Sequence, residues 1–456
     1  MQTNDSPDTS MTTTWETLKA VVRGTFIATS SRNNKEKKAK RSELEDQITS
    51  LVQVGKRIGA RAILRQLNNA RKQPKTLDYE KAEYALLRTK QKYYKRGNKV
   101  GRLLDCKLRA RVLKSRIDAI KNTTGTILHS DEEVAHTFER YYATLYTAED
   151  AVPHDIDAYP HYAGLTKLPP FEASKLETEI KVEEVITAIS RLQLGKAPAL
   201  DGLTPHFYKL FCSLIAPLLT RFYNSFIQTG KLTDSMREAV ITVIPKPGKD
   251  PSQCPSYRPI SLLNVDAKLF TGILAARLNR HMLGLVDPDQ TGFIPERGYS
   301  DNTKRILHLI DKPSRAQKPA ILVSINAEKA FGQVHWPFIH KALDHIGFGP
   351  KFQRWIWCGY TDQKPCVRVN WITSRLFPVA RWTRQGFPLS PPATRPLHGM
   401  PCRKIRHNPI IKGSLWEAQN INLLSMRDVF ASLSDPQSSL LALLTEFDHF
   451  RKVARF

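Results

Sequence analysis

The sequence predicts an α+β fold, in which a basic helical N-terminal region precedes a domain of interleaved helices and short strands. Residues 35–72 and 78–120 repeat apolar side chains at helical spacing, with Lys and Arg at most other positions. Further along, helical patterns alternate with short apolar runs that Pro and Gly interrupt. Since 41% of the 456 residues are hydrophobic, the chain can bury a sizeable core, and its length predicts two to four domains.

Four segments follow from this pattern. They are an N-terminal remnant (1–30), a basic helical linker region (31–150), an irregular Pro-rich linker (151–173) and the α+β domain (174–456). Within the last segment we expect three helices and two strands. The helices are Lys175–Leu194, 205–230 (ending at Gly230) and 266–283, and the strands are Ala239–Ile244 and Ala320–Val323.

The charge of the chain predicts a polyanionic partner. Formal net charge is +26, and residues 31–120 hold 26 Lys and Arg against 9 Asp and Glu. Such an excess is typical of proteins that bind RNA or DNA. A solvated pair of basic helices, or a coiled coil, would carry the same charge without any ligand, so composition leaves both readings open.

Several function classes find no support in the sequence. No apolar run approaches the roughly 18 residues of a membrane span, and the N-terminus lacks the basic and apolar regions of a secretory signal. The cysteines form no CxxC pair and are expected to be reduced thiols. We therefore expect an intracellular protein of the nucleus or cytoplasm, not a secreted one. The cysteines are Cys106, Cys212, Cys254, Cys358, Cys366 and Cys402.

Five blocks carry a family resemblance through their order and spacing. They are LGKAPALDGLTPHFYK (194–209), SYRPISLLNVDAK (256–268), GFIPERGYSDNTKRI (292–306), SINAEKAFGQVHW (324–336) and TRQGFPLSP (383–391). Together they resemble the reverse transcriptase domain of a LINE-type, non-LTR retrotransposon polyprotein, in a truncated and degenerate form. The resemblance implies the fingers and palm of a right-hand polymerase, with the thumb missing because the chain stops at Phe456. It also implies an RNA template, a DNA primer, a nucleotide and Mg²⁺ as partners.

The resemblance also assigns nucleotide-binding residues. Arg258 and Lys246 match positions beside the triphosphate, which needs fixed cations and bidentate donors. Phe331 matches the aromatic under the sugar, and Gln385 and Gly386 match the pair that approaches nucleotide and template. Taken alone, Arg258 reads as surface structure and Phe331 as a core aromatic.

Other matched residues have two open readings. Arg297, Asp301 and Asn302 match a block that contacts template and core, and a role in ordering their own loop fits equally well. The turn that includes Asp201 and Gly202 is explained by turn chemistry alone and serves mainly as a family marker.

The expected metal site departs from the family pattern. Nucleotidyl transfer uses two divalent cations, and Mg²⁺ prefers carboxylate oxygens. Asn326 and Arg427 stand where the family has Asp, and only Asp428 is kept. An Arg about 4 Å from a cation costs a few kcal/mol even at an effective dielectric near 20. We therefore expect the ancestral RNA-templated DNA synthesis to be lost.

A further departure lies at residues 391–405, where the family has an apolar helix. Pro396 and Pro401 and the weak periodicity predict that no helix forms there. One hypothesis is an out-of-phase segment from compensating frameshifts. Three functions remain: a reverse-transcriptase-domain protein that no longer polymerises, a non-enzymatic nucleic-acid-binding protein, and a helical scaffold or unselected remnant.

Overall fold

A computed structural model gives the fold in two compact units, Thr13–Arg116 and a larger unit of Met1–Thr12 with Ile117–Phe456. The residues described are 10–58, 116–147, 159, 164–288, 290–291, 294, 296–316, 321–325, 335–380, 386–411, 414–416, 419–421, 424–425, 429–433 and 436–454.

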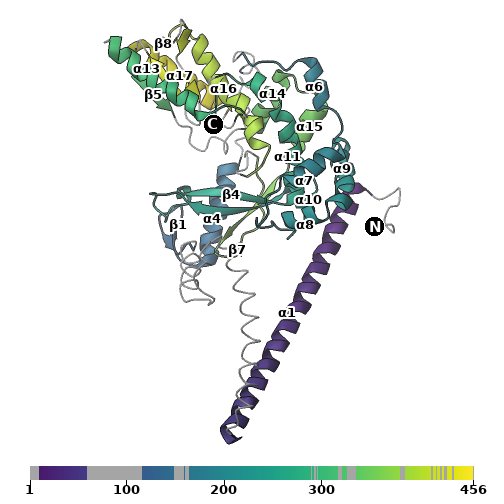
Figure 1. The fold of residues 1–456 in the computed structure, drawn as a ribbon. Coiled ribbons are helices and arrows are strands. Elements are labelled where there is room, and N and C mark those ends of the chain that lie inside the picture. Colours follow the sequence, from purple (N-terminus) through teal and green to yellow (C-terminus); the bar gives the residue numbers. More distant parts are fainter. Residues whose placement is uncertain are drawn as a thin grey trace. The chain divides into compact units, whose positions relative to one another are not determined.

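In the smaller unit, the described part is a single helix, α1 (Met11–Ile58), of 48 residues (Figure 1). It runs without a break past residue 30, where the sequence analysis placed a segment boundary, because no proline interrupts residues 11–58. Ion pairs one turn apart, such as Arg41 with Glu45 at 3.0 Å, support it. The predicted helix 78–120 lies mostly outside the described residues, and its last residue belongs instead to β1 (Ile120–Lys121).

A four-stranded mixed sheet in the larger unit has the order β4-β3-β6-β7. Its strands are β3 (Glu238–Pro245), β4 (Tyr257–Leu263), β6 (Lys364–Val369) and β7 (Ile372–Thr373). The predicted strand Ala239–Ile244 is confirmed as β3. It pairs antiparallel with β4 and parallel with β6. A hairpin of β1 and β2 (Ile127–Leu128) and helix α4 (Asp131–Tyr146) belong to the same unit.

Helix α4 covers this sheet with aromatic side chains. Phe138, Tyr142 and Tyr146 are buried, and the Phe138 ring meets Tyr257 of β4 edge-on at a centroid distance of 5.1 Å. Burial raises the pKa of the Tyr142 and Tyr146 hydroxyls far above their ordinary value. This apolar contact packs α4 against the loop end of the β3–β4 hairpin.

A second aromatic core is built from Phe222, Tyr223, Phe226 and Phe270, and this unit contains a series of further short helices. They are α6 (Pro170–Leu176), α7 (Val182–Ser190), α8 (Pro205–Leu210), α9 (Cys212–Thr229), α10 (Asp234–Arg237), the 3₁₀ turn η3 (Cys254–Ser256), α11 (Val265–Asn279), α12 (Met282–Leu285), α14 (Trp336–Ile346) and α15 (Pro350–Cys358). As predicted, α9 ends at Gly230, whose φ of 67° is left-handed.

The predicted helix Lys175–Leu194 is wrong, because two helices with a turn between them occupy this range. Buried Arg277 donates hydrogen bonds to the carbonyl oxygens of Leu176 and Thr178, which turns these groups away from a continuous helix. The new helix α7 starts where the Glu184 carboxylate accepts the Lys181 backbone N–H at 3.0 Å.

A three-stranded sheet with the order β10-β11-β5 completes the fold. Its strands are β5 (Ile321–Ile325), β10 (Leu424–Ser425) and β11 (Val429–Leu433), and β5 confirms the predicted strand near Ala320–Val323. Nearby elements are α13 (Tyr299–Ala316), α16 (Ser390–His407), the hairpin β8 (Ser414–Trp416) with β9 (Gln419–Ile421), and α17 (Pro436–Ala454). One apolar cluster joins α16, α17 and β5: Cys402, Ile405, Ile411 and Leu443 are buried, with Val323 and Ile325 of β5 packed against them.

The prediction that residues 391–405 form no helix is also wrong. Helix α16 spans Ser390–His407 and contains both Pro396 and Pro401 (Figure 1). Each proline removes one backbone donor. Most described side chains of the helix are buried, so packing outweighs that loss. A helix that buries most of its surface shows a weak amphipathic period, which is why the pattern was not visible.

Polar side chains also tie α16 into the unit. Arg403 donates to Asp287 at 2.9 Å and to the carbonyl oxygens of Gly164 and Leu285, and Arg406 donates to the other Asp287 oxygen at 2.7 Å. The Arg395 carbonyl accepts the Gln290 amide at 3.0 Å. These bonds connect α16 to segments more than a hundred residues earlier in the chain, and the frameshift hypothesis stays a prediction for the nucleotide sequence.

The observed architecture is thus a mixed α+β fold, mostly helical, as the sequence predicts at that level. Among the described helices, none combines the length and the hydropathy that crossing a bilayer requires.

Candidate nucleotide-binding and catalytic site

The β3–β4 hairpin carries the predicted phosphate-binding cations at its tip. Ile244 pairs with Arg258 and Pro245 with Tyr257, so Lys246 begins the connecting loop beside Arg258. Alternation along β4 buries Tyr257 and leaves Arg258 exposed. The Lys246 ammonium group donates to the Pro255 carbonyl at 2.9 Å, which holds it against the hairpin.

Gly386 lies directly against this hairpin. Its φ is +104°, and a Cβ at this position would be 3.0 Å from the Ser261 carbonyl oxygen of β4. Only glycine adopts this backbone without strain and allows so close an approach. The TRQG block therefore meets β4 three residues from Arg258. Gln385, its neighbour in the chain, lies outside the described residues.

The two strands that lead to the predicted metal positions are register partners. Ile325, the last residue of β5, pairs with Val429, the first residue of β11. In the sequence, Asn326 follows Ile325, and Arg427 and Asp428 precede Val429. Asn326, Phe331, Arg427 and Asp428 themselves lie outside the described residues. Among the residues that are described, no three His, Cys, Asp or Glu side chains converge as metal ligands.

Arg297 and Asn302 make contacts that order their own loop. The Arg297 guanidinium donates to the Leu283, Val286, Asp287 and Gln290 carbonyl oxygens. Asn302 is fully buried and donates to the Thr291 hydroxyl at 3.2 Å. These contacts give both residues a structural role, and template contact stays a prediction. Asp301 lies in α13, and its side chain is outside the described part.

Asn264, which the sequence analysis missed, joins the first block to the hairpin. Its side-chain oxygen accepts the Asp201 backbone N–H at 3.4 Å, and its amide donates to the Ser235 carbonyl at 2.8 Å. The only signal in the sequence was a polar residue at the end of an apolar strand. Lys268 lies in the first turn of α11, which follows Asn264. Burial and the nearby Lys196 lower the pKa of its ammonium group, although Asp201 opposes this shift.

The structure thus shows a basic hairpin, a glycine-dependent contact against it and a pair of strand ends in register, each within or next to a block of the family pattern. Residues 244–400 match the family described as "Reverse transcriptase (RNA-dependent DNA polymerase)". The match extends into α16, as expected for a helix native to this fold. The chain contains a reverse transcriptase domain distantly related to those of non-LTR retrotransposons, as predicted.

Three relatives show the range of similarity. The "Transposon TX1 uncharacterized 149 kDa protein" of Xenopus laevis is 28% identical over 61% of this chain and 21% of its own length. The "RNA-directed DNA polymerase from mobile element jockey" of Drosophila melanogaster is 25% identical over 60% of this chain and 30% of its own length. The Pol polyprotein from the "type-2 retrotransposable element R2DM" of the same organism is 29% identical over 44% of this chain and 18% of its own length. The chain spans less than a third of each relative.

Proposed function

We propose that this chain is a nucleic-acid-binding, reverse-transcriptase-domain protein of retrotransposon descent that no longer synthesises DNA. In this proposal the β4-β3-β6-β7 sheet corresponds to the fingers and the β10-β11-β5 sheet to the palm of a right-hand polymerase. RNA template, DNA primer and nucleotide are its ancestral ligands, in keeping with the name of the jockey relative, an RNA-directed DNA polymerase.

The pairing of Ile325 with Val429 carries the proposal. Strand partners lie about 5 Å apart, so the residues that follow one and precede the other start from the same end of the sheet. At that end the sequence supplies Asn326, Arg427 and Asp428. This set does not fit two Mg²⁺ ions, because it holds one carboxylate and one permanent cation.

The hairpin supports the binding half of the proposal. Arg258 is exposed and Lys246 lies beside it, as expected for groups that meet a triphosphate or a nucleic-acid backbone. Template-directed primer extension tests the catalytic half. We expect no extension above background by the purified chain in Mg²⁺ or Mn²⁺. Extension that Asp428→Ala abolishes would refute the loss of activity.

Non-enzymatic binding through the basic region is the second candidate, favoured by a specific observation. Lys35, Lys38 and Lys40 of α1 are exposed. We expect residues 31–120 to bind RNA or DNA with little sequence preference. The logarithm of affinity should fall with the logarithm of salt by about 0.7 to 0.9 for each neutralised phosphate. An affinity that does not change with salt would contradict this candidate.

A further inference from the structure

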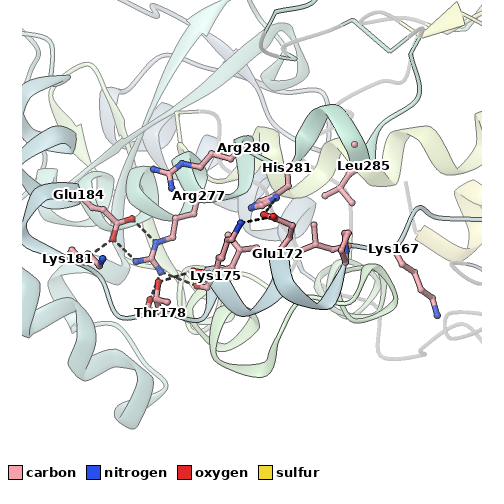
Figure 2. Close-up of a pocket in the computed structure, with 14 residues that line it drawn as sticks. Lys167, Glu172, Lys175, Thr178, Lys181, Glu184, Arg277, Arg280, His281 and Leu285 are labelled. Carbon is pink, nitrogen blue, oxygen red and sulfur yellow. Dashed lines mark hydrogen bonds and ion pairs between the residues drawn. The ribbon is translucent and has the colours of Figure 1, made fainter.

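A basic pocket of about 720 Å³ opens between α6, α7 and the α11–α12 segment (Figure 2). It shares no residue with the nucleotide-binding and catalytic residues discussed above. Its lining includes five Lys and Arg side chains but only two carboxylates, Glu172 and Glu184. The basic residues are Lys167, Lys175, Lys181, Arg277 and Arg280.

Arg277 forms the floor of the pocket and has no donor left for a ligand. Its guanidinium carries five N–H groups. All five have acceptors: two go to Glu184, at 2.8 and 2.6 Å, and three go to the Leu176, Thr178 and Glu179 carbonyl oxygens. Its side chain is 5% exposed and stacks on Trp355. Arg277 therefore connects the segments between α6 and α7 that line the pocket, and the Glu184 carboxylate balances its charge.

At the other end of the pocket a second balanced pair occurs. Lys175 lies 2.7 Å from Glu172, which is also 3.6 Å from the His281 ring. Burial lowers the pKa of His281, although Glu172 opposes that shift, so the ring adds little charge near pH 7. The charges of Lys175 and Glu172 cancel, so this end of the pocket carries little net charge for a ligand.

Lys181 and Arg280 supply the charge that remains. Both are exposed, and no ion pair joins either one to a carboxylate at 4 Å or less within the described part of the chain. Figure 2 shows both on the Glu184 side of the pocket, whereas Lys167 points away from it. Helix α7 also begins on this wall, since Lys181 precedes it and Glu184 lies in its first turn. The positive end of its dipole adds to the field.

We propose that this pocket binds a backbone phosphate of a nucleic acid, through Lys181 and Arg280, at a site separate from the polymerase site. An exposed guanidinium and an exposed ammonium group on one basic pocket supply the charge and the hydrogen-bond donors that a phosphodiester accepts. The chain's charge of +26 will keep nucleic acid concentrated around it. This inference does not depend on whether the chain polymerises DNA.

Lysine footprinting of the full chain tests the site directly. Acylation of each lysine is measured by mass spectrometry with and without a short single-stranded oligouridine. We expect RNA to protect Lys181 and to leave Lys167, on the same pocket but directed away from it, reactive. Inorganic tripolyphosphate at equal phosphate concentration should protect Lys181 much less. Equal protection by tripolyphosphate would assign the site to free phosphates, and stronger protection by polyglutamate would assign it to an acidic protein; either overturns the proposal.

Charge-neutralising variants provide a second readout. Lys181→Gln with Arg280→Gln should lower RNA affinity about tenfold at about 150 mM salt. The salt slope should fall by about 1.4, because each single-strand phosphate contact contributes about 0.7. Lys364→Gln with Arg375→Gln removes the same charge from exposed positions elsewhere and should change affinity less than twofold. Thermal unfolding confirms that both variants fold. Equal losses of RNA affinity in the two double variants would show that only net charge matters. A Lys181 that RNA does not protect would show that RNA does not bind in this pocket.

Discussion

Ile325 and Val429 face each other at the ends of β5 and β11, and this pairing decides which residues start from the same end of the β10-β11-β5 sheet. The segments that follow Ile325 and precede Val429 are about a hundred residues apart in sequence. We therefore expect substitutions in either segment to affect the same site.

The first prediction concerns metal binding at that site. Asn326→Asp with Arg427→Asp should raise Mg²⁺ affinity at least about tenfold, since removing one like charge at about 4 Å is worth several kcal/mol. Isothermal titration measures the change. Asn33→Asp with Arg32→Asp, an adjacent pair in α1, makes the same charge change far from the site in sequence and should gain nothing. If the two double variants bind Mg²⁺ alike, the strand-end assignment fails.

Gly386 gives the second prediction. Gly386→Ala should lower the free energy of unfolding by about 2 kcal/mol or more, through positive-φ strain and a clash with the Ser261 carbonyl. Gly248→Ala, at φ +71° with open space around it, carries only the strain and should lose about 1 kcal/mol. Urea unfolding compares them. Losses of equal size would mean that the close approach to β4 carries no energetic weight.

Elements with a local sequence signal were predicted correctly, whereas features that depend on residues far apart in the sequence were missed. Strand β3 and the end of α9 at Gly230 were predicted because periodicity and a C-terminal glycine are local signals. The break after Leu176 was missed because its cause, Arg277, lies about a hundred residues away. Helix α16 was missed because the proline rule describes an isolated helix and says nothing of the burial that offsets it.

In the candidate site, too, local signals were visible in the sequence and long-range contacts were not. Family blocks located the cations Lys246 and Arg258, and the structure places both at the loop end of the β3–β4 hairpin. Nothing in the sequence indicated that Gly386 would meet Ser261, since the two are 125 positions apart and the contact is between backbones.

The third prediction tests whether α16 is integral to the fold. Arg403→Met should lower the free energy of unfolding by about 2–3 kcal/mol, because it leaves buried carbonyl groups without a donor. Arg451→Met removes an exposed pair with Asp448, at 2.7 Å, and should cost no more than about 1 kcal/mol. Denaturant titration measures both. A neutral Arg403→Met would show that these bonds do not anchor α16 in the fold.

Glu184 provides the fourth prediction, a pH dependence. Burial raises the pKa of this carboxyl, but hydrogen bonds from Arg277 and the Lys181 backbone outweigh it and leave the pKa below 4.5. A lowered pKa in the folded state stabilises the protein above pH 4.5, and that stability is lost as pH falls through the folded-state pKa. Glu184→Gln should therefore be less stable at pH 7 and show a flatter pH dependence below pH 4.5. Glu183→Gln, which changes an exposed neighbour, should retain the wild-type profile in urea titrations.

Trp371 gives the fifth prediction. It is 83% exposed and has a φ of +71°, next to Asn370 at +48°, in the two-residue turn between β6 and β7. Such turns favour Asn-Gly. Trp371→Gly should therefore be about 1 kcal/mol more stable than Trp371→Ala, which retains the strain. Thermal unfolding compares the stability of the two variants. A Trp371→Ala variant more stable than Trp371→Gly would contradict this prediction.

The bonds from Arg403 and Arg406 to Asp287 have a consequence for how the chain folds during synthesis. They join positions more than a hundred residues apart, as does the pairing of β5 with β11. Contacts this distant in sequence form slowly, and domains fold as units. The ribosome must therefore finish α16 and β11 before the larger unit can close. Until then, the apolar surface that α16 covers stays open to chaperones, proteases and other nascent chains.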